Sequence, residues 1–358
     1  MAVTIHKGRG ALSNPAGRFE AAEREAFDDG WGSLEELALD PSPETRTIVD
    51  RTRSIIATND SPDIGFDRSI NPYRGCEHGC VYCYARPTHA FLGLSSGLDF
   101  ETRIFVKPEA AKLLRAELAR PGYRPATLAL GSNTDPYQPL ERRLRITREV
   151  LEVLHATRHP VGIVTKSALV VRDIDLLAPM SALGLARVWL SVTTLDAELA
   201  RKLEPRASQP MRRLDAVRRL TAAGVTSGVM VAPVIPVLTD HELERLVAAA
   251  AEAGAVSIGH TLVRLPYEVK ELMTGWLRTH YPQRADHVLS LIRQCRDGKL
   301  NDAEFGSRFR GKGVYAELIA QRFARAMERH GLQRRLRPQR TDLFRPPRDG
   351  AQLSLELE

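Results

Sequence analysis

The stretch NPYRGCEHGCVYCYARP, residues 71–87, holds three of the four cysteines in the chain. Cys76, Cys80 and Cys83 have the spacing C-x3-C-x2-C, whereas Cys295 stands far away in the C-terminal part. Four cysteines among 358 residues are too few for a disulfide scaffold, and a tight group of thiols in a reducing compartment is typical of a metal site. The stretch therefore predicts that these thiolates bind zinc or an iron–sulfur cluster.

The number of ligands distinguishes these two kinds of site. A structural zinc ion normally has four protein ligands, so His78 or His89 would have to complete the set. A [4Fe-4S] cluster held by three thiolates instead keeps one iron free for an outside ligand, and the spacing favours this interpretation without excluding zinc. Gly75 and Gly79 would let the backbone turn tightly around a cluster, and Tyr82 would supply an aromatic wall.

Short apolar segments alternate with amphipathic segments after the cysteine stretch, which predicts βα units and a parallel sheet. Six units are too few for a closed eight-stranded barrel. The predicted fold is therefore α/β, a partial (β/α)6 TIM-like barrel that stays open. Helix patterns occupy 108–120, 145–157, 211–224 and 240–254, and strand patterns occupy 67–73, 127–132, 161–167, 187–194, 226–235 and 255–265.

Three regions of the chain differ in pattern. Residues 1–66 lack clear periodicity, which predicts an irregular N-terminal extension before the barrel at 67–265. Residues 266–358 predict a helical, basic C-terminal region that ends in an irregular tail, with helices over 267–281, 285–298 and 315–331.

Charge is distributed unevenly along the chain, whose formal net charge is +7. Residues 1–60 carry seven Lys+Arg against eleven Asp+Glu, whereas residues 308–345 carry eleven against three. The densest basic block is QRRLRPQR, residues 333–340. A basic surface of this kind attracts phosphate groups, so nucleic acid is a candidate partner, with a merely solvated helix face as the alternative.

The sequence shows neither of two common signals for a location outside the cytoplasm. No apolar run is long enough to span a membrane, and the N-terminus lacks the apolar core of a secretory signal. We therefore expect a cytoplasmic protein that does not bind a membrane. The sequence does not indicate the oligomeric state.

Polar residues stand where the predicted strands end. GSNTDP, residues 131–136, follows the second strand, Lys166 follows the third, and Ser191 lies in the fourth. Folds built from βα units place their chemistry at the carboxyl ends of the strands, and the cysteine stretch follows the first strand. A simple turn at 131–136 and a solvated lysine are the alternative interpretations.

The decapeptide CEHGCVYCYA resembles the signature C-x3-C-x-aromatic-C of the radical S-adenosylmethionine (SAM) superfamily. The segments SINPYRGC, CYARP, GSNTDPYQPLE, TKS and RDIDLL resemble the branch related to spore photoproduct lyase, often described as DNA repair photolyase-like. This resemblance extends from about residue 50 to about residue 265. Its motifs occur in order and at barrel spacing, which makes it specific.

The resemblance implies the chemistry of that superfamily. Cys76, Cys80 and Cys83 would bind a [4Fe-4S] cluster, and SAM would bind the fourth iron through its amine and carboxylate. One electron from an external donor of the flavodoxin or ferredoxin type would split SAM into methionine and a 5′-deoxyadenosyl radical. That radical would abstract hydrogen from the substrate.

The resemblance implies that Lys166 binds SAM, and the strand-end positions suggest the other side chains, although Ser191 could instead bond to the backbone, and Glu204 and Arg206 could contact only each other. Lys166 would meet its carboxylate, and Ser191 its carboxylate or ribose. Glu204 and Arg206 are further candidates to contact SAM or the substrate. The remaining residues expected at the cofactor are Tyr82, Ser132, Asn133, Thr134 and Asp135.

One position departs from the pattern of spore photoproduct lyases. Those enzymes carry a hydrogen-donating cysteine near the end of the second strand, where this chain has Ser132, whose O–H bond is too strong for that task. Tyr137 and Tyr267 are alternative donors. The substrate is therefore open, with nucleic acid first and peptide second. The rival interpretation is a nucleic-acid-binding protein with a structural zinc or iron–sulfur site and no catalysis.

Overall fold

The computed structural model describes residues 6–19, 43–333 and 336–347. Much of the acidic N-terminal stretch, two arginines of the basic block and the end of the tail lie outside the described residues. Within them, no helix is both long and apolar enough to cross a bilayer.

The main sheet has seven strands in the order β10-β9-β8-β7-β6-β3-β2. All neighbours are parallel except β2, which pairs antiparallel with β3. Six parallel strands therefore follow one another in chain order, as the sequence predicts. The strands are β2 (Ile56–Thr58), β3 (Arg68–Ile70), β6 (Leu128–Leu130), β7 (Val161–Thr165), β8 (Ala186–Ser191), β9 (Ser227–Val234) and β10 (Ser257–Leu262).

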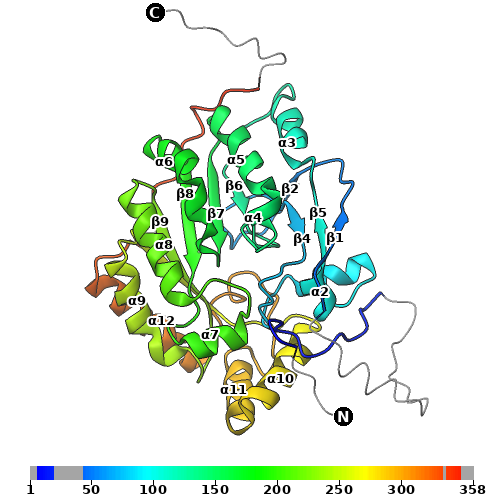
Figure 1. Cartoon of the computed structure of the whole chain (residues 1–358). Coiled ribbons are helices and arrows are strands. Elements are labelled where there is room, and N and C mark those ends of the chain that lie inside the picture. The colour runs from blue at the N-terminus through cyan, green and yellow to red at the C-terminus, as the bar shows by residue number, and fades with distance from the viewer. Residues whose placement is uncertain (1–5, 20–42, 334–335, 348–358) are drawn as a thin grey trace, which may run out of the picture.

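Helices surround the sheet, and α7, α10 and α11 gather at one end of it (Figure 1). Short 3-10 helices η1 (Arg86–Leu92), η2 (Ala168–Asp173) and η3 (Asp240–Glu242) complete the connections. The α-helices are α2 (Leu98–Thr102), α3 (Ala110–Leu118), α4 (Glu141–Leu144), α5 (Ile146–Ala156), α6 (Ile174–Ala182), α7 (Ala197–Leu203), α8 (Pro210–Ala222), α9 (Leu243–Glu252), α10 (Val269–His280), α11 (Pro282–Gln294) and α12 (Gly313–Arg329).

Local sequence explains most of these elements. Helix α5 buries Ile146, Val150, Val153 and Leu154 on one face, and burying that apolar stripe against the sheet stabilises it. Helices α6 and α7 are absent from the sequence expectation. In α6, Pro179 interrupts the helical pattern.

A second, smaller sheet has the order β1-β5-β4, with β1 (Arg46–Val49), β4 (Tyr73–Arg74) and β5 (Arg103–Val106). Strands β1 and β2 lie in the part for which the sequence predicts only irregular structure. Both are short, and β1 is exposed along its length, so neither has the apolar alternation that identifies a strand. Strand β4 leads directly into the cysteine stretch.

The barrel stays open, because β10 and β2 are edges of the main sheet and do not pair with each other. An ion pair links the segments next to these edges. The guanidinium of Arg308 binds both carboxylate oxygens of Asp63, at 2.8 and 2.5 Å. Asp63 belongs to the β2–β3 loop, and Phe309 next to Arg308 accepts the backbone N–H of Leu262 in β10.

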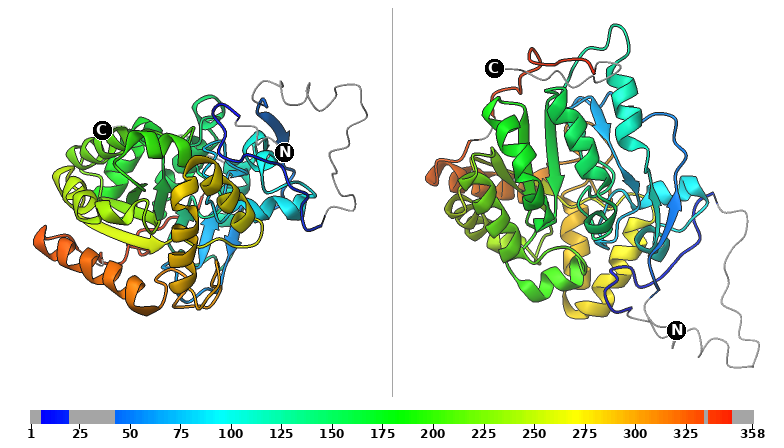
Figure 2. Two further views of the ribbon diagram at one scale, coloured as in Figure 1. Left: turned by 90° about the horizontal axis from the view of Figure 1, so that it is seen from below. Right: turned by 45° about the horizontal axis from the view of Figure 1, so that its top comes forward.

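The C-terminal tail crosses the amino ends of the strands, opposite α10 and α11 (Figure 1, red; Figure 2, right). The side-chain amide of Gln339 donates to the carbonyls of Val161 and Leu185, and Gln333 N–H donates to Val256 O. The described part of the basic block therefore closes the amino end of the barrel.

Candidate active site

The three clustered cysteines lie together in the loop between β4 and η1. Cys76 and Cys80 are only 7% and 8% exposed, and Cys83 is half-buried. Cys83 packs against the residues around both of the other cysteines. Backbone hydrogen bonds from Cys83 N–H to Cys80 O (3.2 Å) and from Cys76 N–H to Phe100 O (2.9 Å) hold the loop in place.

Two glycines make this loop sterically feasible. Gly75 and Gly79 have φ angles of 82° and 68°, in the left-handed region that favours glycine. A Cβ at Gly75 would lie 2.8 Å from both His89 Cε1 and Phe100 O. The tight turns expected at both glycines are present.

The electrostatic surroundings of the thiols suit a cationic centre. Burial raises the pKa of Cys76 well above its usual range, and the carboxylate of Asp135 adds to the effect. Burial likewise raises the pKa of Cys80, while the positive charge of Lys166 opposes the increase. Thiolates at these positions therefore need a bound cation to compensate their charge, which metal coordination supplies.

Each of the two histidines considered as zinc ligands has one ring nitrogen engaged, whereas Nδ1 of His89 is buried without a hydrogen-bond partner in the described part of the chain. His78 Nδ1 lies 3.2 Å from a carboxylate oxygen of Asp135, and His89 Nε2 lies 3.0 Å from the carbonyl of Arg103. Across residues 6–19, 43–333 and 336–347, no three His, Cys, Asp or Glu side chains are arranged to hold one metal ion. Zinc needs four ligands at one point, whereas each thiolate of a cubane binds a different iron. The donor set fits a cluster.

Lys166 extends from the end of β7 toward the cysteine loop. Its ammonium donates to Ser191 Oγ (2.7 Å) and to the carbonyl of Ala232 (3.3 Å), and it lies 5.8 Å from the centre of the Tyr82 ring. It has no carboxylate within 4 Å in the described part of the chain. A half-buried ammonium without a counter-ion is suited to bind an anionic ligand group.

Glu204 is held inside the protein rather than presented to a ligand. Its carboxylate pairs with Arg213 and accepts hydrogen bonds from Tyr82 and Thr193 (2.6 Å from Thr193). Burial favours the protonated acid, but the charges of Arg213 and Lys166 and these hydrogen bonds outweigh it and hold the pKa at about 2. The network fixes the Tyr82 ring beside Cys80.

The turn at 131–136 mostly supports the cysteine loop from within. Thr134 Oγ1 donates to Gly75 O (2.6 Å), and Ser132 Oγ exchanges hydrogen bonds with the Asn71 amide. Asp135 is largely buried and accepts from Thr165 Oγ1 (2.6 Å) and from the backbone of Lys166 (2.7 Å). Burial favours its neutral form, yet His78 and these donors lower its pKa to about 2.

These contacts show how much of the turn is already engaged within the protein. Both Asp135 oxygens are already occupied, as is the hydroxyl of Thr134, so these two residues position the cysteine loop and β7. Asn133 is exposed, and only its backbone N–H is engaged, by Asn71 (2.9 Å). Asn133 and Ser132 thus remain the candidates from this turn.

Other sequence candidates have structural partners. Arg206 pairs with the buried Glu77 (3.0 Å) rather than with Glu204. Tyr137 is fully buried, and its hydroxyl donates to Asp173 (3.0 Å), which excludes it as an accessible hydrogen donor. Tyr267 is 59% exposed and stacks under Arg18, while Cys295 is completely buried in the apolar core.

Sequence reasoning missed Arg213 and Thr193. Arg213 donates to Ser191 O (2.8 Å) and Ser208 O (2.6 Å) besides pairing with Glu204, so it joins α8 to the strand end that carries Ser191. The signal was available, since Arg213 stands on the apolar face of α8 together with Leu214 and Val217. A charge on the buried face of a helix needs a buried partner.

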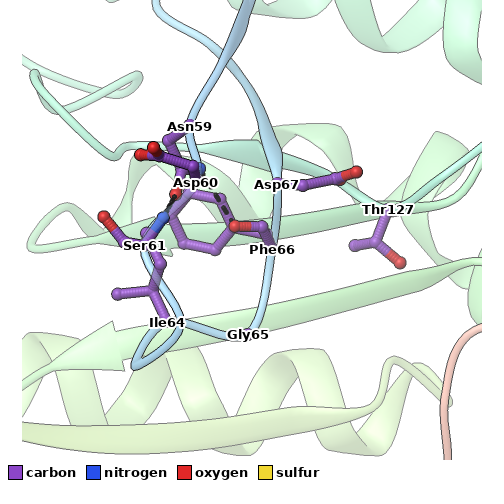
Figure 3. Close-up of a pocket in the computed structure, with 8 residues that line it drawn as sticks. All are labelled: Asn59, Asp60, Ser61, Ile64, Gly65, Phe66, Asp67 and Thr127. Carbon is purple, nitrogen blue, oxygen red and sulfur yellow. Dashed lines mark hydrogen bonds between the residues drawn. The ribbon is translucent and has the colours of Figure 1, made fainter. Parts of the chain in front are cut away.

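A separate hollow of about 440 Å³ lies at the β2–β3 loop and contains none of these residues (Figure 3). Its lining includes Asp60 and Asp67, with Phe66 and Thr127. It is an open feature at the amino end of β3 and β6, away from the cysteines.

The fold and the cysteine loop together define a class. Residues 70–250 match the radical SAM superfamily. The chain belongs to this superfamily, as the cysteine signature predicts.

Two curated relatives are similar in sequence to part of this chain. The protein Rv2578c of Mycobacterium tuberculosis (strain H37Rv) is 38% identical over 231 residues, which cover 64% of this chain and 68% of that protein. The protein MJ0683 of Methanocaldococcus jannaschii is 29% identical over 173 residues, covering 48% and 62%.

The solved structures show the same fold. A mutant of spore photoproduct lyase with bound AdoMet and dinucleoside spore photoproduct has a TM-score of 0.55 at 19% identity over 79% of each chain. Another spore photoproduct lyase mutant has a TM-score of 0.56 at 18% identity, covering 88% of this chain and 86% of that one. The open α/β barrel and its likeness to this lyase confirm the fold expected from the sequence.

Proposed function

We propose that the chain is a radical SAM enzyme in which Cys76, Cys80 and Cys83 hold a [4Fe-4S] cluster and Lys166 binds the carboxylate of SAM. The observation that carries the proposal is the ammonium of Lys166, which has no carboxylate within 4 Å among the described residues and lies near Tyr82 of the cysteine loop, where Ser191 and the Ala232 carbonyl hold it. The bound cofactors would supply a 5′-deoxyadenosyl radical for hydrogen abstraction. Tyr82, Glu204 and Arg213 keep the wall of the site rigid and dry.

Production of 5′-deoxyadenosine tests this proposal. The chain is purified anaerobically, loaded with iron and sulfide, and incubated with SAM and dithionite. The expected result is brown protein that absorbs near 400 nm, holds about four iron atoms and forms 5′-deoxyadenosine. Colourless protein with one tightly bound zinc and no SAM cleavage would instead establish the purely structural site.

Substitution Lys166→Ala should weaken SAM binding. Loss of one charge-assisted contact to a carboxylate lowers affinity by roughly tenfold or more. Calorimetric titration of the cluster-loaded chain with SAM measures the effect. Lys202→Ala is the matched control, because the partly exposed Lys202 pairs with the exposed Glu198 on α7. Equal affinity of Lys166→Ala and wild type would refute the assignment.

We further propose that the substrate is nucleic acid, bound at an aromatic–arginine rim beside the cysteine loop. The rim consists of Tyr84, Arg264, Phe305, Arg308 and Phe309. Tyr84 follows Cys83, and the guanidinium of Arg264 lies 5.2 Å from the Tyr84 ring centre and 5.3 Å from that of Phe309. Tyr84 and Phe305 are 47% and 58% exposed, and a guanidinium lies over each ring, so bases could stack on these rings from the other side.

The rim carries excess positive charge. Arg308 pairs with Asp63, whereas Arg264 makes no ion pair or hydrogen bond with any described residue. Burial lowers the pKa of Arg264, and the charge of Arg308 lowers it further, against the opposing effects of Tyr84 and Asp63. Two guanidinium groups thus lie near one carboxylate, which pairs only with Arg308, and a phosphate would relieve this imbalance. A peptide substrate has no comparable feature in its favour.

Substitution Arg264→Ala should weaken binding of a fluorescent single-stranded 20-mer DNA and reduce the slope of log affinity against log salt by about 1. Fluorescence anisotropy between low and high salt measures both quantities. Arg325→Ala is the control, since Arg325 is exposed on α12. A loss of affinity confined to Arg325→Ala would place the nucleic acid on the C-terminal helix instead.

A further inference from the structure

Residues 9–18, which we call the strap, lie across the outer side of the cysteine loop and continue toward α10 (Figures 1 and 2, dark blue). Their contact with the loop is very close at Gly10. A Cβ at Gly10 would overlap the carbonyl oxygen of Gly79 and lie 3.0 Å from its carbon, so glycine alone fits. Ala11 is fully buried and packs with Cys80, Val81 and Tyr82.

A buried carboxylate joins the strap to the backbone of the cysteine loop. Glu101 accepts the N–H groups of Gly10 (3.0 Å) and Ala11 (2.8 Å), and it pairs with Arg86 (2.5 Å). Arg86 in turn donates to Cys80 O (2.8 Å). Both Glu101 and Arg86 are completely buried, so this connection excludes water.

Further contacts hold the rest of the strap. Asn14 and Asp99 exchange two hydrogen bonds of 3.0 Å, from Asn14 Nδ2 to Asp99 Oδ1 and from Asp99 N–H to Asn14 Oδ1. A Cβ at Gly97 would overlap the carbonyl of Ser13. Arg18 pairs with Glu268 at 2.6 Å, next to α10. The strap is therefore attached along its length, although it has no regular secondary structure.

We propose that the strap is part of the cofactor site. It keeps the loop of Cys76, Cys80 and Cys83 in its binding conformation and shields the cluster from water and oxygen. The physical reason is that the strap completes the hydrogen bonds of Glu101, which with Arg86 holds the backbone of the cysteine loop. Glu101 and Arg86 would otherwise face solvent, and opening of the loop would cost little. The proposal rests on the proposed function for the identity of the cluster.

Substitution Gly10→Val in the full chain tests the strap. The added side chain must displace the strap from Gly79, so the absorbance near 400 nm of the loaded protein should decay in air by roughly tenfold faster than in wild type. Arg18→Ala releases only the end attached to Glu268 and should give a smaller acceleration in the same direction. Gly275→Ala is the control, because a Cβ there meets no atom within 4 Å.

Two further measurements make the outcome decisive. Circular dichroism of Gly10→Val shows whether the chain is folded, and if it is not, Arg18→Ala carries the test. Labelling of Cys80 by a maleimide in the cluster-free chain, followed by mass spectrometry, should also be faster in both variants. If the wild-type chain bound no iron, the proposed function would be refuted. The labelling rate of Cys80 would still test the strap proposal, because it is measured without a cluster. The strap proposal would be overturned if Gly10→Val and Arg18→Ala both showed the same decay of absorbance and the same Cys80 labelling rate as wild type.

Discussion

Replacing Cys83 with alanine should abolish the iron centre. Each loop cysteine supplies one thiolate, and Cys83 packs against the surroundings of the other two. Two remaining thiolates cannot hold a cubane, so iron should fall from about four atoms per chain to less than about one. Colorimetric iron analysis and the absorbance near 400 nm measure this loss, and formation of 5′-deoxyadenosine should cease with it.

Cys295→Ala is the matched control for this experiment. Cys295 is the remaining cysteine of the chain and is buried in the core, where it is only a small apolar side chain. Its variant should keep the iron content and SAM cleavage of wild type. Full iron content in Cys83→Ala would mean that another side chain completes the site.

Substitution Arg213→Met should destabilise the protein by about 3–5 kcal/mol, because it leaves the buried charge of Glu204 without its partner. Glu204 and Arg213 each expose only 1% of their side chains. Urea unfolding followed by circular dichroism in anaerobic buffer measures the change. Arg212→Met is a suitable control, since Arg212 is exposed on the same helix and should change stability by less than about 0.5 kcal/mol.

A second substitution separates charge from packing. Adding Glu204→Gln to Arg213→Met removes the unpaired charge, so part of the lost stability should return. If adding Glu204→Gln instead lowers the free energy of unfolding by as much again as Arg213→Met did alone, the hydrogen bonds of the network contribute more than the ion pair.

The same carboxylate gives a defined pH dependence. The pKa of Glu204 falls from an ordinary 4.5 to about 2 in the folded protein. Its contribution is therefore complete above about pH 5 and decreases as the pH falls from there toward 2, amounting to about 3 kcal/mol. The stability difference between wild type and Glu204→Gln should accordingly narrow below pH 4.5. A constant difference down to pH 3 would contradict this pKa.

Much of the scaffold was predictable because its signals are local. The six apolar segments correspond to β3, β6, β7, β8, β9 and β10, and the spacing of Cys76, Cys80 and Cys83 indicated a shared ligand. Strands β1 and β2 were not predictable, since pairing with distant partners stabilises them rather than an apolar pattern. The position of the C-terminal tail was not predictable either. Its positive charge suggested a phosphate-binding surface, and its hydrogen bonds to distant segments place its backbone across the amino end of the barrel.

The sequence by itself determined the superfamily, the parallel order of the strands and the three thiols, because each depends on residue type and spacing over short stretches. Only the tertiary structure decided which polar residues stay available. Asp135 and Lys166 look equally suited to a ligand in the sequence, yet Asp135 is occupied by His78 and Thr165 while Lys166 lacks a counter-ion. Those partners come from distant segments, and a charge that already has an oppositely charged partner within the fold is less available to a ligand.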